Sequence, residues 1–256
     1  MNVLRTLAVS LSLYSRIPMP QFQWKEEDMK HVLIFLPVVG AVIGGSVYLA
    51  RQLTIAKHST MFQLFFVALS SLLPLLITGG FHLDGFMDVC DALRSYGEKE
   101  KKLAILKDPH IGAFSVICLL MYALAWGGAL LLLVEKGNLV LFCTIFFISR
   151  AACGLTCTLF AGAKKDGMLQ MERSGMVRSD VIFLWIQLIA GLLFGLWFDW
   201  KASLLLALTL FFYTIYYHAL CKKQFGGVTG DTAGYYIVMS ELWMLIALAA
   251  YGYWGV

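Results

Sequence analysis

Long apolar stretches separated by short polar segments run along almost the whole chain. Seven of them have about 18 or more residues with few charges, which is the length and composition of a transmembrane helix. They lie at about 32–50, 62–81, 111–134, 139–162, 181–198, 202–220 and 235–255. The apolar segment 3–14 is too short to cross a bilayer, and we expect it at the membrane interface. The pattern predicts an all-α, polytopic membrane bundle of about seven transmembrane helices.

Composition supports a membrane protein with a single domain. Hydrophobic residues occupy 60% of the 256 positions and charged residues only 14%, with a mean hydropathy of +0.77. Soluble globular domains carry roughly 25% charged residues. The six cysteines have no zinc-finger spacing, and no repeat or linker divides the chain. We therefore predict one membrane-embedded domain over residues 1–256.

Lysines and arginines alternate between the two sides of the predicted bundle. Fifteen lie in the N-terminal segment and in the polar loops near 82–110, 163–180 and 221–234, whereas four lie in the opposite connections. Because positively charged short loops stay in the cytoplasm, we predict a cytoplasmic N-terminus and an external C-terminus. The net charge of +4 then reflects topology, so it does not predict a nucleic-acid partner.

The stretch GGFHLDGFMDVCDAL, residues 79–93, concentrates acidic residues where the chain leaves the second apolar stretch. Asp84, Asp88 and Asp91 have the i, i+4, i+7 spacing that places side chains on one face of a helix. No lysine or arginine at matching spacing neutralises them. A divalent cation would relieve the repulsion, and oxygen ligands favour Mg²⁺ or Mn²⁺. The alternative is a solvated helix face or a cap on the next helix. Glycines that allow a sharp turn or a close approach flank the acids at Gly79, Gly80 and Gly85.

A second polar patch, LKDPHIG at residues 106–112, precedes the third apolar stretch. Its Lys107, Asp108 and His110 either form a turn fixed by the Asp-Pro step or provide a cation and an imidazole for a phosphate. Composition alone favours neither alternative.

A third patch, FGGVTGDTAG at residues 225–234, opens the last apolar stretch. Glycines and Thr229 form a loop rich in N–H donors that leads into a helix N-terminus, which is a natural anion site. No Gly-Lys-Ser/Thr sequence follows, so the patch is not a P-loop.

Two ionisable residues, Arg150 and Glu241, fall inside predicted transmembrane helices. Ionisable groups within a bilayer are costly, and they usually mark a functional site with a partner. The structural alternative is an ion pair between the two.

The ordered set of GGFHLDGFMDVCDAL, LKDPHIG and GGVTGD resembles the cobalamin synthase family, the adenosylcobinamide-GDP ribazoletransferases. The segments SLYSRIPMP (residues 12–20) and FLPVVGAVIGG (residues 35–45) resemble the beginning of that family. The similarity therefore extends, in order, over nearly the whole chain.

The resemblance implies a Mg²⁺-dependent phosphotransferase of cobalamin biosynthesis in the cytoplasmic (inner) membrane of a prokaryote, with its active site facing the cytoplasm. Adenosylcobinamide-GDP and α-ribazole, or its 5′-phosphate, would give adenosylcobalamin, or its 5′-phosphate, and GMP. Partners would be these two substrates and the lipid bilayer, with a homo-oligomer or a complex with other late enzymes of the pathway as further expectations.

The resemblance also implies roles for the polar residues. Metal ligands would be Asp84, Asp88, Asp91 and Asp231, and the catalytic residues would be His82, Asp88 and Asp91. We favour Asp91 as the base, by analogy with the membrane CDP-alcohol phosphotransferases. Substrate-binding residues would be Gly79, Gly80, Gly85, Lys107, Asp108, His110, Arg150, Gly226, Gly227, Thr229, Gly230 and Glu241.

Two other functions compete with this interpretation. A CDP-alcohol phosphotransferase of phospholipid synthesis would have Asp-Gly-x-x-Ala-Arg, whereas Phe86-Met87-Asp88-Val89 follows Asp84-Gly85 here. A cation transporter would carry carboxylates near the middle of the bilayer and often has inverted repeats. Here the acids concentrate at one predicted rim, so we favour the enzyme.

Overall fold

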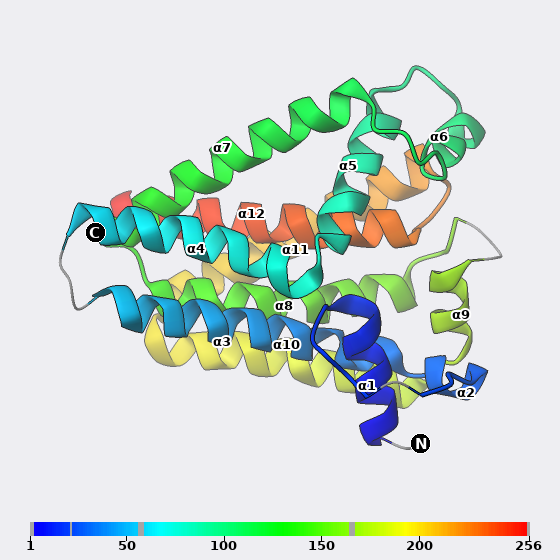
Figure 1. Ribbon diagram of the computed structural model, residues 1–256, viewed down its shortest axis with the longest axis horizontal. Helices are drawn as coiled ribbons and strands as arrows, with labels where there is room; N and C mark the ends of the chain where they lie inside the picture. The colour runs from blue at the N-terminus through cyan, green and yellow to red at the C-terminus, as the bar shows by residue number, and fades with distance from the viewer. Residues whose placement is uncertain (1–2, 21, 56–58, 164–166, 255–256) are drawn as a thin grey trace.

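The computed structural model describes residues 3–20, 22–55, 59–163 and 167–254, and shows a bundle of long helices lying side by side (Figure 1). Lys57, Lys164 and Lys165, which contribute to the charge pattern above, lie outside the described residues. Within the described ranges there is no β-strand, and one isolated bridge pairs Gly162 with Val228.

Seven described helices are long and apolar enough to cross a membrane, which confirms the predicted number. They are α3 (Leu36–Ile55) with the preceding 3-10 turn η1 (Val32–Phe35), α4 (Thr60–Thr78), α7 (Ala113–Lys136), α8 (Leu139–Leu159), α10 (Arg178–Phe198), α11 (Trp200–Gln224) and α12 (Gly230–Trp254). The shorter helices are α1 (Val3–Tyr14), α2 (Glu26–Met29), α5 (Phe81–Arg94), α6 (Lys99–Ile105) and α9 (Met168–Ser174).

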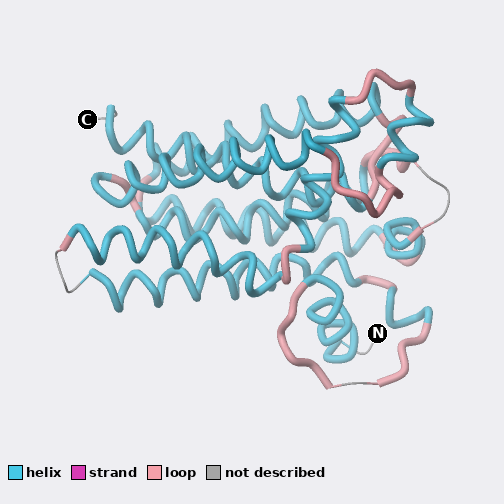
Figure 2. The backbone as a smooth tube through the Cα atoms, turned by 45° about the horizontal axis from the view of Figure 1, so that its top comes forward, coloured by secondary structure: helices cyan, strands magenta, loops and turns pink. Residues whose placement is uncertain are grey.

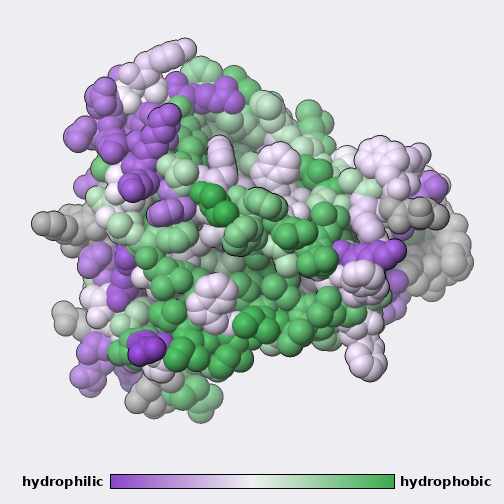
Figure 3. Space-filling view, turned by 180° about the vertical axis from the view of Figure 1, so that it is seen from behind, coloured by the Kyte–Doolittle hydropathy of each residue, from purple (hydrophilic) through white to green (hydrophobic). Residues whose placement is uncertain are grey.

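The short helices gather at one end of the bundle. Figure 1 shows α2, α6 and α9 together at the right, and Figure 2 shows the longer loops at the same end. The space-filling view from behind has hydrophilic residues at this end and a broad hydrophobic surface beside them (Figure 3). We call this the polar end. The three long polar connections therefore lie on one side of the bundle, as the alternation of lysines and arginines requires.

Helix α8 forms the centre of the bundle. In the most apolar 18-residue stretch of α8, 83% of the residues are buried. In the corresponding stretch of α4, at the periphery, only 11% are buried. Every residue from 148 to 157 is buried, and several of them are small, including Ala151, Ala152 and Gly154. Small side chains let neighbouring helices approach closely in a membrane. On α3, a Cβ added at Gly40 or Gly44 would clash with the α8 backbone.

Helix α12 begins at Gly230, five residues before the predicted transmembrane stretch at 235. The earlier start follows from reciprocal capping. The Thr232 N–H donates to Thr229 Oγ1 (3.1 Å), and the Thr229 N–H donates to Thr232 Oγ1 (2.8 Å). These bonds satisfy backbone donors that a helix N-terminus leaves without partners. Asp231 is consequently held in the first turn of a helix and does not lie in a loop.

Two consecutive glycines turn the chain between α4 and α5. Gly79 and Gly80 have φ angles of +68° and +81°, which residues with a Cβ rarely adopt. The Gly80 N–H donates to the Leu75 carbonyl (3.1 Å), which closes the end of α4. Helix α5 therefore leaves the direction of α4 and crosses α12 near the polar end (Figure 1).

Helices α5 and α12 make an unusually close crossing. A Cβ added at Gly85 would lie 2.8 Å from the Asp231 carbonyl oxygen, and one at Gly234 would lie 2.8 Å from the His82 carbonyl oxygen. Both distances are shorter than real Cβ contacts, so these two positions accept only glycine without movement of a backbone. The crossing brings the acidic residues of α5 beside Asp231.

Replacing Gly234 with alanine should therefore destabilise the protein. We expect Gly234→Ala to lower the free energy of unfolding by about 1–3 kcal/mol, because the added methyl overpacks the crossing. The measurement is the thermal unfolding midpoint in detergent. Gly128→Ala on α7, where nothing lies within 4 Å of the added Cβ, is the control and should match the wild type or exceed it slightly. Equal midpoints for Gly234→Ala and the wild type would contradict the close crossing.

Candidate active site

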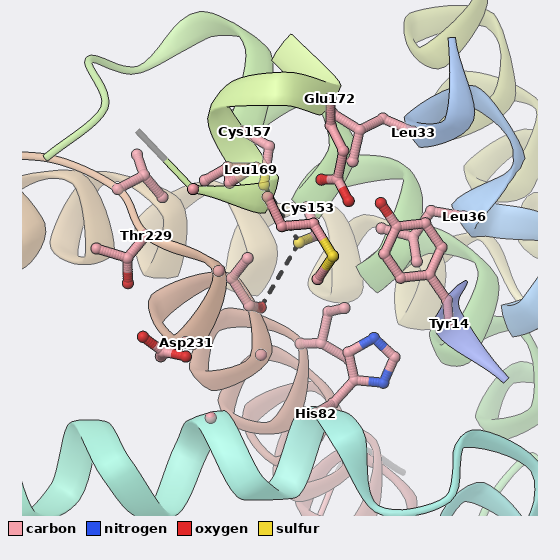
Figure 4. A pocket seen from close by; sticks show the side chains of 18 of the residues that line it. Tyr14, Leu33, Leu36, His82, Cys153, Cys157, Leu169, Glu172, Thr229 and Asp231 are labelled. Atoms are coloured by element: carbon pink, nitrogen blue, oxygen red, sulfur yellow. Dashed lines mark hydrogen bonds between the residues drawn. The ribbon is translucent and has the colours of Figure 1, made fainter. Parts of the chain in front are cut away.

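A cavity of about 250 Å³ opens where α1, α5, α8, α9 and the start of α12 meet (Figure 4). The α5–α12 crossing forms one wall, and α9 with the end of α1 forms another. The polar and ionisable side chains lining it belong to Tyr14, His82, Asp84, Cys153, Cys157, Gln170, Glu172, Arg173, Thr229 and Asp231. The cavity thus combines residues from both ends of the chain.

Three aspartates share one electrostatic environment at the α5 wall. Asp84 and Asp231 line the cavity, and Asp88, one turn further along α5, is half-buried and does not line it. Burial, together with the negative charges of Asp84, Asp231 and Asp91, raises the pKa of Asp88 to about 6. No ion pair joins Asp84 or Asp88 to a basic residue in the described part of the chain. Negative charge therefore accumulates at this wall.

The same carboxylates fit a divalent cation by their chemistry. Their donors are all oxygen, and Mg²⁺ is commonly bound by one or two carboxylates, with water and substrate phosphate completing its coordination. Among the described residues, no group of three His, Cys, Asp or Glu side chains could hold a metal ion unaided. Ligands from the substrate would have to complete such a site.

The Asp91 carboxylate is directed at the start of α7 and not at the cavity. Its Oδ2 accepts the Gly112 N–H (2.8 Å) and its Oδ1 accepts the Ser115 N–H (3.0 Å). The carboxylate thus binds the backbone donors at the N-terminus of α7, where negative charge is favourable. Asp91 does not line the cavity. The structure brings Asp84, Asp88 and Asp231 together and uses Asp91 to fix α7 to α5.

His82 is buried in the cavity wall, and its Nδ1 has no hydrogen-bond partner among the described residues. Burial and the positive charge of Arg150 lower the pKa of His82 well below its usual range. The imidazole is therefore neutral at physiological pH.

Arg150 and Glu241 pair with each other inside the bundle. Arg150 Nη1 donates to Glu241 Oε1 (2.6 Å), and the Ser149 hydroxyl donates to the same oxygen (2.9 Å). The two residues are 1% and 4% exposed, and neither lines the cavity. This arrangement is the structural alternative considered for these residues, and it links α8 to α12.

The LKDPHIG patch forms an exposed turn before α7. Lys107, Asp108 and His110 are all exposed, and Asp108 Oδ1 accepts both the backbone N–H of His110 (3.0 Å) and a contact from its Nδ1 (2.6 Å). None of the three lines the cavity. The turn leads directly to Gly112, which Asp91 binds.

The glycine patch packs on the connection that follows α8. The Val228 N–H donates to the Ala161 carbonyl (2.8 Å), and a Cβ added at Gly227 would lie 2.5 Å from the same oxygen. Gly226 has a φ of +80°. Thr229 and Gly230 line the cavity, whereas Gly226 and Gly227 do not. Of the sequence-predicted glycines in the acidic stretch, Gly85 lines it as well.

The sequence analysis did not predict four of the polar residues that line the cavity, namely Tyr14, Gln170, Glu172 and Arg173. Glu172 and Tyr14 are buried, and Arg173 is half-buried with its Nη2 donating to the Phe160 carbonyl (2.6 Å). The Arg173 Nη1 atom is buried without a described partner. Arg173 contributed only to the charge pattern. Tyr14 ends the segment expected at the membrane interface and lies in a stretch noted for its family resemblance. The pairing of an acid with an arginine in the 163–180 loop was the available signal.

Comparisons with known proteins identify the relatives of this chain. The chain matches the family model described as Cobalamin-5-phosphate synthase over residues 6–249. An adenosylcobinamide-GDP ribazoletransferase of Lachnoclostridium phytofermentans is 38% identical over 248 residues, covering 94% of this chain and 92% of the relative. Proteins of the same name from Clostridium botulinum (strain Alaska E43) and Clostridium perfringens (strain 13) are 31% and 32% identical, over 94% and 95% of this chain and 95% and 97% of their own lengths. No solved structure matches the chain.

The fold and the cavity define a polytopic membrane protein with an acidic site at the polar end of its helical bundle. The chain belongs to the cobalamin-5-phosphate synthase family.

The crowded carboxylates should make the site a source of instability in the absence of a cation. We expect Asp88→Asn to raise the thermal midpoint above pH 6, where the wild-type carboxylate is charged and disfavoured by burial and its neighbours. Because the folded-state pKa of Asp88 lies above its unfolded value, the gain should disappear as the pH falls toward about 4 and both states become protonated. Melting curves between pH 4 and 8 in a chelating buffer would measure it. Glu100→Gln on the exposed helix α6 is the control, and a pH-independent gain would contradict the assignment.

Proposed function

We propose that the protein is an adenosylcobinamide-GDP ribazoletransferase that joins adenosylcobinamide-GDP to α-ribazole or its 5′-phosphate. The products are adenosylcobalamin, or its 5′-phosphate, and GMP. A hydroxyl of the acceptor attacks the phosphorus on the cobinamide side of the diphosphate, and the bond to GMP breaks. The observation that carries the proposal is the convergence of Asp84 and Asp231 on one cavity in a chain of this family.

The reaction needs charge neutralisation at the diphosphate and an in-line arrangement of the attacking and leaving oxygens. Asp84, Asp88 and Asp231 would hold Mg²⁺ or Mn²⁺, which would supply positive charge to the phosphate oxygens. Arg173 lines the same cavity with a buried N–H group that has no described partner, and we assign it to a phosphate oxygen. Asp91 keeps α7 against α5 and so positions the acidic wall.

The placement of the acids favours this function over its two rivals. Asp84 and Asp231 lie at the polar end, near the ends of helices, as an enzyme acting on soluble substrates at a membrane surface requires. The ionisable pair inside the bundle, Arg150 and Glu241, is mutually neutralised and does not extend into the cavity. We place the polar end in the cytoplasm, because the basic loops lie there, with the chain in a prokaryotic cytoplasmic membrane.

The test is GMP release by purified protein reconstituted in vesicles with adenosylcobinamide-GDP. Separate arms add α-ribazole or α-ribazole 5′-phosphate, each with Mg²⁺ or with a chelator. We expect Mg²⁺-dependent release, and a loss on the order of 10²-fold or more in Asp84→Asn, because a cation ligand and charge stabilisation are removed.

Two variants serve as controls for that experiment. Glu100→Gln changes an exposed acid of the polar end and should leave release unchanged. Asp91→Asn should lower stability through a weaker α5–α7 contact and should retain far more activity than Asp84→Asn. Absence of release from folded wild-type protein in every arm would overturn the proposed function.

A further inference from the structure

The wall of the cavity that faces α9 contains a second set of polar groups, separate from the aspartates. In Figure 4, Glu172 and Tyr14 lie across the cavity from Asp231 and point toward one another. Glu172 is 3% exposed and Tyr14 is 5% exposed. No cation pairs with Glu172 among the described residues, and the facing Tyr14 hydroxyl is the group that stabilises its carboxylate. Both residues line the cavity.

Burying the Glu172 carboxylate costs free energy, and no ion pair in the described part of the chain offsets this cost. A buried carboxylate is normally paired with a cation or fully hydrogen-bonded. The neighbouring Arg173 turns its Nη2 to the Phe160 carbonyl, and no described ion pair includes Glu172. Burial raises the pKa of Glu172 to about 7, and the facing Tyr14 hydroxyl partly offsets this effect. The carboxylate is therefore balanced between its two protonation states near neutral pH.

The groups around Glu172 leave it chemically separate from the acidic wall. Tyr14 faces it from α1, Cys153 and Cys157 face the cavity from α8, and His82 lines it from α5. The pKa of Glu172 depends on burial, which raises it, and on Tyr14, which lowers it. A base for the reaction has to remain free when the aspartates are committed to a cation, and its best pKa lies near the working pH. Glu172 meets both conditions, whereas both oxygens of Asp91 are occupied by α7.

We propose that Glu172 is the base that accepts the proton of the acceptor hydroxyl, and that Tyr14 is a positioning residue that orients the Glu172 carboxylate. The inference rests on the proposed function. The hydroxyl proton moves to Glu172, the hydroxyl oxygen forms the new bond to phosphorus, and the phosphorus–oxygen bond to GMP breaks with its electron pair on GMP. Glu172 then releases the proton to solvent, so the carboxylate is regenerated.

The experiment measures GMP release by reconstituted full-length protein from pH 5.5 to 9 at saturating Mg²⁺, with kcat and KM determined separately. In the wild type the rate should fall below about pH 7 as Glu172 becomes protonated. Glu172→Gln should lower kcat by about 10²–10⁴-fold with little change in KM for adenosylcobinamide-GDP, and the acidic fall in rate should disappear.

Two further variants separate chemistry from folding. Tyr14→Phe removes the hydroxyl that lowers the pKa of Glu172, so its acidic fall should move to higher pH with a smaller loss of rate. Glu172→Asp keeps a carboxylate and should retain a pH-dependent fall even if Glu172→Gln is unstable. Thermal midpoints of all variants are recorded in the same vesicles.

The outcomes distinguish this proposal from the one on which it rests. Glu172→Gln within a few-fold of the wild-type kcat, with the acidic fall unchanged, would overturn the role of Glu172 and leave ribazole transfer intact. An unchanged pH profile in Tyr14→Phe, or loss of the acidic fall in a folded Glu172→Asp variant, would overturn it as well. A wild type that releases no GMP refutes the proposed function instead.

Discussion

The close approach of α5 to α12 is the constraint on which the site depends. The two helices come from distant parts of the chain, and only a hydrogen at Gly85 and Gly234 lets their backbones meet. Had either position carried a side chain, α5 would stand away from α12, and Asp84 and Asp231 would no longer share one cavity. Helix packing in membranes relies on such small residues because lipid offers no hydrophobic drive to bring helices together. The geometry of the acidic wall therefore depends on two glycines, Gly85 and Gly234, because they have no side chains.

The ionisable groups around this crossing are of two kinds. Some are paired or hydrogen-bonded and stabilise the bundle, and others have no basic partner. The Arg150–Glu241 pair is neutralised and hydrogen-bonded within the bundle, and Asp91 satisfies backbone donors of α7. Asp88 and Glu172 instead carry raised pKa values without a basic partner. Shifts of this kind concentrate at functional sites, because a group that must bind or move a proton cannot also be paired. The division indicates which acids stabilise the fold and which serve chemistry.

Much of the fold follows from local pattern, because length and apolarity alone define a transmembrane helix. The seven helices and the helical character of the acidic stretch could be predicted in this way. The start of α12 could not, because it depends on reciprocal bonds between Thr229 and Thr232. The spacing places Asp91 near the other acids, but the direction of its carboxylate depends on where α7 begins. Tyr14 and Glu172 could not be assigned to the site from the sequence, because only tertiary packing brings α1 and α9 to the same cavity as α5.

The cavity joins Tyr14 of the first helix to Asp231 of the last described one. A ribosome delivers these two walls to the membrane at opposite ends of synthesis, with six membrane-crossing helices between them. The cavity therefore cannot form in a nascent chain before α12 has inserted in the correct direction. Only chains whose helices have all inserted in the correct orientation can then be active. A misassembled chain would be inactive as well as unstable.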